Sequence, residues 1–322
     1  MTRGTTGGPG TGDRSVPAAG SSPELGAPRP AVAHRAGRGA GMARRVARDF
    51  SRNRLGMVGL GIIVGLVLFC FVGPLVYHTD QVHVNLAQVD LPPGHSGHLL
   101  GTDDVGHDIL GRLMYGGRNS LEIGLAAGVI AVWLGTLWGA VAGYAGGWVE
   151  GLMMRIVDAG IAIPALFLLL VVATMVTPTV PMLIVIIGLV SWLVPARLVR
   201  AETVSLRTRD YVQVVKAMGG GATRAVFRHI VPNVVGTMIV NATFQVADAI
   251  LLLAYVSFLG LGLPQPQTDW GGMLSNGIQY TYDGYWWMII PAGVVIVLVV
   301  SAFNFVGDAL RDAFEVRLQG RS

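Results

Sequence analysis

The 322-residue sequence has little charge, one lysine and one cysteine. Charged residues make up only 13% of the chain, about half of the usual share in soluble domains, whereas hydrophobic residues make up 52%. Together with a mean hydropathy of +0.57, this balance indicates a membrane protein with several spans. The single cysteine, Cys70, excludes a disulfide within the chain.

The sequence also lacks the common enzyme motifs. A phosphate-binding P-loop needs Gly-Lys-Ser or Gly-Lys-Thr after a glycine-rich turn, but the only lysine, Lys216, lies ahead of Gly219–Gly221. Neither G-x-S-x-G nor H-E-x-x-H occurs. The isoelectric point of about 9.5 comes without a basic patch interleaved with aromatic residues, so it does not indicate nucleic-acid binding. These absences favour a transport component with no catalytic residues and no cofactor of its own.

Residues 1–54 differ in composition from the rest of the chain. Glycine, proline, alanine, serine and threonine dominate there, and ten arginines stand against three acidic residues. Such a segment has too few large apolar side chains to form a core, so we expect a disordered, basic cytoplasmic tail. Arg44 and Arg45 precede an apolar run, which raises the alternative of a twin-arginine signal. The missing small-residue cleavage site and the long apolar run favour a retained anchor helix instead.

Tracts without charge predict an all-α membrane domain of six spans over residues 55–317, followed by a short tail at 318–322. Leu55–Tyr77 is about 34 Å long as a helix, which is enough to cross a bilayer. The tract between Asp158 and Arg197 is too long for one span, and Pro178 and Pro181 divide it into two. The other spans are expected at 122–150, 234–261 and 285–307, with a first outer loop at 78–118.

The basic residues are distributed unevenly between the loops. Six spans place both termini on one side, and only Arg112 and Arg118 of the 23 basic residues fall on the other side. Because basic residues accumulate in cytoplasmic loops, both termini are predicted to be cytoplasmic. The loop at 201–232 is then cytoplasmic as well.

The second half of this loop has a distinctive pattern. In the octet 211–218, the apolar residues fall on one helical face, and a helix this short needs a partner for stability. Three glycines then permit a sharp reversal, and Pro232 suits the first turn of the next helix. The stretch resembles the cytoplasmic coupling loop of ABC-importer permeases, whose characteristic positions match Tyr211, Gly219, Ile230 and Pro232. The other alternative is an ordinary connecting loop.

The resemblance has one departure, because Gln213 begins the triplet that usually starts with glutamate. It implies that this loop docks onto a cytoplasmic ATPase. The residues assigned to ATPase coupling are Tyr211, Val212, Gln213, Val215, Met218, Gly219, Ile230 and Pro232.

A cluster of acidic residues and histidine in the first outer loop invites comparison with a metal site. The spacing of Asp103, Asp104, His107 and Asp108 fits no calcium loop, and one histidine with three carboxylates is a weak signal, so no metal site is expected. Residues 99–121 instead resemble a signature of the peptide and nickel branch of ABC permeases. The matching positions are Gly101, Thr102, Asp103, Gly106, Asp108, Arg112, Tyr115, Gly116 and Arg118.

Further segments at 147–158, 257–262, 270–271 and 303–314 extend the resemblance to residues 50–317, with departures at His107 and Leu253. The chain is most similar to the second permease subunit of dipeptide and oligopeptide importers, which implies an ABC type I importer permease fold in the bacterial cell membrane. The implied partners are a second homologous permease, two cytoplasmic ATPases that bind ATP and magnesium, and an extracytoplasmic solute-binding protein. Nickel complexes or glutathione remain alternative solutes.

Two other classes of protein remain open at this stage. A secondary transporter or channel would need intramembrane coupling charges or inverted repeats, and the sequence shows one mid-span acid and no internal repeat. A membrane-embedded hydrolase would need a nucleophile and a base within the spans, where no histidine is found except at their flanks.

The fifth span carries polar residues at Thr237, Asn241, Gln245 and Asp248, spaced by four, four and three. At about 100° per residue they fall within a sector of roughly 80° on one helical face. Polar groups facing lipid are costly, so this face is predicted to line the translocation pathway. The alternative is that these side chains form hydrogen bonds between helices.

Overall fold

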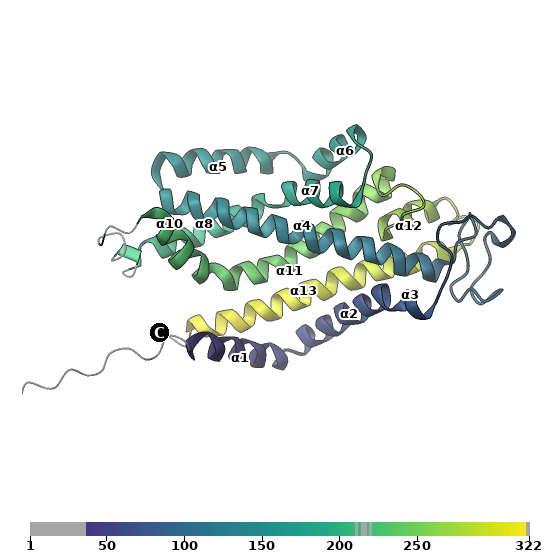
Figure 1. The fold of residues 1–322 in the computed structure, drawn as a ribbon, viewed down its shortest axis with the longest axis horizontal. Helices are drawn as coiled ribbons and strands as arrows, with labels where there is room; N and C mark the ends of the chain where they lie inside the picture. Colours follow the sequence, from purple (N-terminus) through teal and green to yellow (C-terminus); the bar gives the residue numbers. More distant parts are fainter. Residues whose placement is uncertain (1–36, 210–211, 214–217, 219–220, 320–322) are drawn as a thin grey trace, which may run out of the picture. The chain divides into compact units, whose positions relative to one another are not determined.

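The computed structural model describes residues 37–209, 212–213, 218 and 221–319. Within these ranges the chain is helical, without named strands, and two isolated bridges lie in the loop at 95–108. The chain divides into two units, Met1–Met42 and Ala43–Ser322, and only Gly37–Met42 of the first is described. In the second unit, long helices run side by side, as Figure 1 shows. The predicted all-α membrane fold is confirmed.

The first described helix corrects the expectation of a disordered segment at 1–54. Helix α1 spans Gly37–Arg52, with apolar and basic residues on different faces. Asn53 then leaves the helical conformation, and its side chain accepts a hydrogen bond from the backbone N of Gly56 at 3.1 Å, which caps α2. Helices α2 (Arg54–Phe71) and α3 (Gly73–Val76) together form the first candidate span, close to the expected 55–77.

Helix α4 (Ile109–Ala145) is the packing centre of the unit. It has 37 residues, or about 55 Å, and contacts α2, α5, α7, α8 and α11. It begins at Ile109 because Asp108 caps it, so the first loop ends at 108, ten residues earlier than expected. Glycines permit the contacts: a Cβ at Gly128 would lie 2.8 Å from Val246, and one at Gly135 would lie 2.6 Å from Pro195.

Two bent helix pairs follow. Helix α5 (Gly147–Ala162) and α6 (Ala165–Met175) meet at 79°, and α7 (Val180–Ser191) and α8 (Leu193–Arg207) meet at 42°. The expected division of the 158–197 tract is confirmed, because the chain is not helical at 176–179. Two boundaries were wrong. The span expected at 122–150 ends at Ala145, and the loop predicted at 201–232 begins only after Arg207.

The remaining elements complete the bundle. They are α10 (Ala222–Ala225), a π-helical turn at Val226–Ile230, α11 (Val231–Val256), a second π-helical turn at Ser257–Leu261, α12 (Trp270–Ile278) and α13 (Ile290–Gln319). Short 3-10 turns lie at Leu86–Gln88 and Trp286–Met288. Helix α13 extends twelve residues beyond the expected end at 307 and into the segment assigned to the tail. Helix α12 was not predicted.

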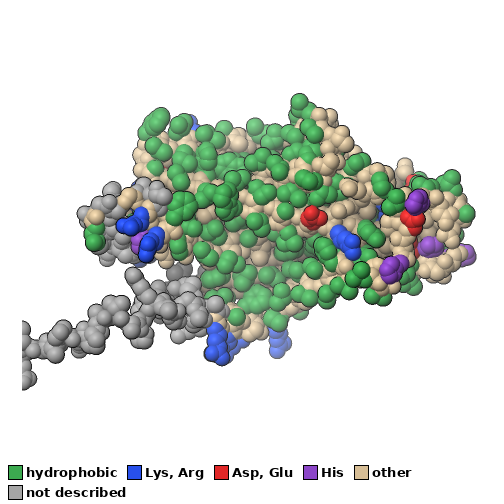
Figure 2. All heavy atoms as spheres, in the orientation of Figure 1, with side chains coloured by type: hydrophobic (Ala, Val, Ile, Leu, Met, Phe, Trp, Pro, Cys, Tyr) green, Lys and Arg blue, Asp and Glu red, His purple; other side chains and the backbone are tan. Residues whose placement is uncertain are grey.

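Length and composition agree with several membrane crossings. Four stretches of the described chain are long and apolar enough to span a bilayer, and six are if each bent pair is one span. Figure 2 shows hydrophobic side chains covering the long sides of the unit, whereas histidines gather at one end. We call this the loop end, formed by residues 77–108 and 262–289. The opposite end, with α10 and the last turn of α8, is the tail end.

Candidate functional site

Helix α11 carries the polar face expected to line a pathway. Pro232 lies in its first turn, directly after the π-helical turn at Val226–Ile230, and the helix continues without interruption to Val256. Gly260 has a φ of 83°, which ends the π-helical turn that follows. The polar residues therefore lie on one continuous helix in the centre of the unit.

Two of the four polar side chains bind neighbouring helices. The hydroxyl of Thr237 donates to Glu202 Oε1 on α8 at 2.5 Å. The Gln245 side chain donates to the backbone O of Ser191 at 2.6 Å. Ser191 is the last residue of α7, where the bend toward α8 interrupts the helical hydrogen-bond pattern. Thr237 and Gln245 thus fit the alternative of interhelical bonding.

The other two residues of the face differ from this pattern. Asn241 donates to the backbone O of Thr237 in its own helix at 3.1 Å. Asp248 is exposed on the surface of the unit and has no hydrogen bond or ion pair with any described residue. Asp248 is therefore the residue of the face that remains free for a pathway role.

A second free carboxylate lies on α4. Glu122 is exposed and, like Asp248, has no partner among the described residues. Helices α4 and α11 are antiparallel, because Gly124 packs against Ile250 and Gly128 packs against Val246. This register places Glu122 and Asp248 about one helical turn apart along the helices. We call them the acidic pair.

Glu122 was expected at the boundary of a span, but it lies 13 residues inside α4. The extra length of α4 places this carboxylate within the helix, about one helical turn from the level of Asp248. A charge exposed at this depth is costly against lipid, so both groups need a water-filled cavity or a neighbouring subunit.

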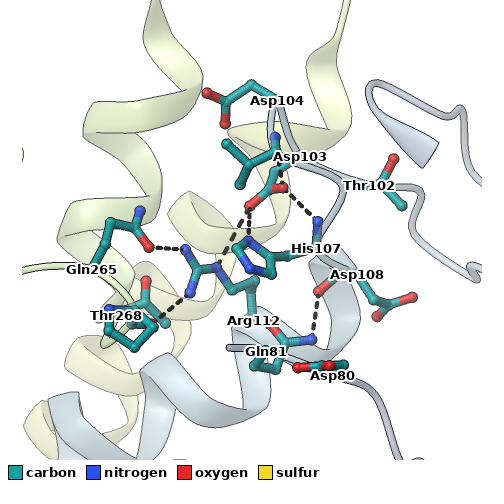
Figure 3. Close-up of polar contacts among 12 residues, drawn as sticks. Asp80, Gln81, Thr102, Asp103, Asp104, His107, Asp108, Arg112, Gln265 and Thr268 are labelled. Atoms are coloured by element: carbon teal, nitrogen blue, oxygen red, sulfur yellow. Dashed lines mark hydrogen bonds and ion pairs between the residues drawn. The ribbon is translucent and has the colours of Figure 1, made fainter. Parts of the chain in front are cut away.

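At the loop end, a buried polar cluster surrounds Arg112 (Figure 3). Its guanidinium donates to the backbone O of Pro266 at 2.9 Å and to Gln265 Oε1 at 2.8 Å, and its Nε lies 3.6 Å from Asp103 Oδ2. His107 Nδ1 lies 3.2 Å from the same Asp103 oxygen. We call these groups the loop-end clamp. The clamp ties the 262–269 loop to the first turn of α4.

A neighbouring cluster fixes the start of α4. Asp108 is 2% exposed, accepts from the backbone N of Gly111 at 2.7 Å, and lies 2.8 Å from both Tyr77 Oη and His98 Nδ1. Burial and the adjacent carboxylate raise the pKa of Tyr77 to about 12. Asp103 and Asp108 are thus bonded separately, Asp103 to His107 and Asp108 to His98 and Tyr77. In the described ranges, no three such side chains come close enough to hold a metal ion.

Helix α12 covers the loop end from the other side. Asp269 caps it by accepting from the backbone N of Gly272 at 3.0 Å, and the Trp270 indole donates to the backbone O of Leu113 at 3.0 Å. Asn119 on α4 donates to the backbone O of Thr268 at 2.7 Å. A small opening remains at the clamp, with Asp104 and Asn276 among the residues in its wall.

Much of the predicted coupling loop falls outside the described residues, including Tyr211, Val215 and Gly219. Val212 is 2% exposed, so it packs within this chain, whereas Met218 is 82% exposed. Val212 therefore differs from Met218 in exposure, and the coupling role assigned to both residues stays a prediction. Gln213 donates to the backbone O of Arg207 at 3.1 Å.

The segment after the glycines joins the coupling loop to the bundle. Ile230 is fully buried in a cluster with Val199, Val226 and Val234, and Pro232 is exposed. The end of this segment is therefore packed against both α8 and α11.

Comparison with known proteins gives matches over most of the chain. Residues 135–320 match the family model described as binding-protein-dependent transport system inner membrane component. Residues 41–93 match the N-terminal TM domain of oligopeptide transport permease C. The two matched regions include α4 from Gly135 onward, α11 and α13, together with the first span.

Several bacterial proteins are similar over nearly their whole length. The oligopeptide transport system permease protein OppC of Bacillus subtilis is 37% identical over 270 residues, covering 84% of this chain and 88% of that protein. The dipeptide transport system permease protein DppC of the same organism is 34% identical over 272 residues, covering 84% and 85%. OppC of Haemophilus influenzae is 34% identical over 269 residues, covering 83% and 86%.

Proposed function

The chain belongs to the family of binding-protein-dependent transport system inner membrane components, and we propose that it is the permease subunit of an ATP-driven importer of dipeptides or oligopeptides. One observation carries this proposal: the chain contains both the oligopeptide-permease N-terminal domain at 41–93 and the transport core at 135–320. The proposal gives the chain half of a translocation pathway and no chemical step of its own.

The proposal includes an orientation and a set of partners. Most arginines belong to the chain segments at the tail end, and only Arg112 and Arg118 belong to the segments near the loop end. The positive-inside rule therefore supports a cytoplasmic tail end and an extracytoplasmic loop end. A second homologous permease would complete the pathway. Two cytoplasmic ATPases would bind ATP and magnesium, and an extracytoplasmic binding protein would deliver the solute.

The acidic pair gives the pathway its proposed chemistry. A peptide carries a positively charged amino group, and each of these two exposed carboxylates, which lie on the sides of α4 and α11 away from their mutual contact, attracts such a group. Glu122 and Asp248 are exposed within helices that can span the membrane. Contact between a charged side chain and lipid is costly there, so a polar pathway is the more favourable environment. The second permease would complete the wall of the pathway. The carboxylates would then attract the amino group of a passing peptide without binding it tightly.

The coupling loop supplies the proposed link to ATP hydrolysis. Met218 is exposed for contact with an ATPase, and Ile230 anchors the far end of the loop in the core of this chain. Closure of the ATPases would move this anchor and, through α8 and α11, change access to the acidic pair.

A transport assay with matched variants tests the proposal. Val215→Asp is expected to abolish peptide uptake and copurification of the ATPases while membrane insertion persists. Gln213→Glu, which restores the residue typical of the family, is the matched control and is expected to leave uptake unchanged. Uptake of radiolabelled dipeptide, nickel and glutathione is compared in cells with and without the gene. Undiminished uptake and ATPase association in Val215→Asp, or loss of nickel or glutathione uptake alone, would contradict the proposal.

A further inference from the structure

A row of arginines lies on one face of α1, outside the transport machinery described above. Arg44, Arg48 and Arg52 recur every fourth residue, so they fall within about 80° of one another around the helix, and all three are exposed. Val46 and Phe50 lie on the opposite face and are half-buried. We call the first set the arginine face.

The apolar side of α1 is held by the bundle. A Cβ on Gly56 would lie 3.2 Å from Phe50 Cε2, so the ring packs closely against the first turn of α2. The same position faces Ala309 of α13, and Asn53 between the two helices lies 3.5 Å from Asp312. These contacts fix which face of α1 packs inward and leave the arginine face outward.

The position of this face relative to the membrane follows from the chain itself. Arg52 is only two residues ahead of Arg54, where the apolar stretch Arg54–Val76 begins. At about 1.5 Å per helical residue, Arg52 lies about 3 Å and Arg48 about 9 Å before Arg54 along the chain, so this end of the arginine face reaches the lipid headgroups at the start of the span. Figure 2 shows basic side chains projecting from the edge of the molecule where α1 and α2 lie in Figure 1.

These arginines have no counter-ion among the residues that the structure describes. Arg44, Arg48 and Arg52 form no ion pair with a described residue, whereas Arg197 and Arg200 near the same end pair with Asp158 and Glu150. Unpaired guanidinium groups held at headgroup depth match the charge and geometry of lipid phosphates.

We propose that the arginine face of α1 binds the headgroups of anionic phospholipids in the leaflet where the first span begins. Under the orientation in the proposed function this is the cytoplasmic leaflet, whose anionic lipids attract basic segments next to a span. The role is a fixed attachment of the α1–α2 junction to the membrane surface. It depends on the charge of the side chains more than on their exact shape.

Binding of a fluorescent phosphatidylglycerol to the purified full-length chain in neutral detergent tests this proposal. A phosphatidylcholine with the same label is the neutral probe. Each arginine at such a surface contributes roughly fivefold in affinity. The triple variant R44Q/R48Q/R52Q is therefore expected to bind phosphatidylglycerol between about tenfold and hundredfold more weakly, with no change for phosphatidylcholine. R44K/R48K/R52K is expected to stay within about fivefold of the unchanged chain.

Arg155→Gln provides the control, because Arg155 is an exposed basic residue on α5. It is expected to leave phosphatidylglycerol binding unchanged. Equal binding by the triple glutamine variant would overturn the proposal. So would loss of copurified ATPase in that variant with lipid binding intact, because the face would then serve a protein partner. Since the assay needs neither ATP nor solute, its result is independent of whether the proposed transport function holds.

Discussion

Replacement of Arg112 by methionine tests how strongly the loop-end clamp holds the 262–269 loop on α4. The side chain is 3% exposed and donates two hydrogen bonds, to Pro266 and Gln265, besides its contact with Asp103. Methionine fills similar volume but donates nothing, so these three acceptors lose a partner in a buried site. Breaking a buried charged pair costs about 3–5 kcal/mol, and we expect Arg112→Met to lower the free energy of unfolding by that amount.

The structure also predicts how much of the lost free energy of unfolding comes from the charge of Arg112 and how much from its hydrogen bond to Gln265. Lysine keeps the charge but cannot donate to two acceptors in the same fork, so Arg112→Lys is expected to cost about 1–2 kcal/mol. A double-mutant cycle between Arg112→Met and Gln265→Ala should give a coupling energy of about 1–2 kcal/mol.

The measurement is unfolding of the purified chain by SDS titration in mixed micelles, followed by circular dichroism. Arg155→Met, at an exposed position on α5, is the control and should change the free energy of unfolding by less than about 0.5 kcal/mol. If Arg112→Met falls within 1 kcal/mol of the unchanged chain, the clamp does not stabilise this end of the molecule.

Three further predictions concern the acidic pair, the first loop and the orientation. Asp248→Asn and Glu122→Gln should each reduce uptake of cationic peptides severalfold with normal assembly, and unchanged uptake in both would exclude a pathway role. Burial and nearby acids raise the pKa of Asp90, so its charged form destabilises the folded loop. Asp90→Asn should therefore increase the free energy of unfolding fully at neutral pH, and the pH-dependent part of this gain should disappear below about pH 4. SDS titrations at several pH values would measure this dependence. In a cysteine-free background, a cysteine at Thr281 should react with an impermeant reagent outside intact cells and one at Thr223 only after permeabilisation; the reverse pattern would invert the proposed orientation.

The sequence was sufficient for the fold class because hydropathy reports directly on which segments lipid can surround. It was less reliable for helix ends, which depend on local hydrogen bonds. Arg112 and Arg118 were assigned to a loop, but α4 begins at the Asp108 cap and is longer than a bilayer is thick. A helix that extends beyond the lipid can carry charges within its length. The same reasoning explains why Glu122 was expected at the edge of a span, although it lies within α4.

The polar face of α11 shows a second limit of sequence reasoning. Periodicity places Thr237, Gln245 and Asp248 together, but it cannot tell which neighbours offer an acceptor. Gln245 is used inside the bundle because the bend after Ser191 frees a carbonyl, and that bend depends on tertiary packing. Likewise, the arginines of α1 were counted as tail charge, and only the packing of Phe50 against Gly56 shows which side of the helix remains free.

The length of α4 has a mechanical consequence. The helix is an unbroken rod of about 55 Å whose first turn belongs to the loop-end clamp and whose last turn lies beside α8 at the tail end. Its glycines bring neighbouring backbones into direct contact, which leaves few long side chains to absorb a small movement. A tilt of about 10° would therefore displace one end by roughly 10 Å relative to the other. Such a rod acts as a lever, converting a small push at one membrane surface into a change of shape at the opposite one.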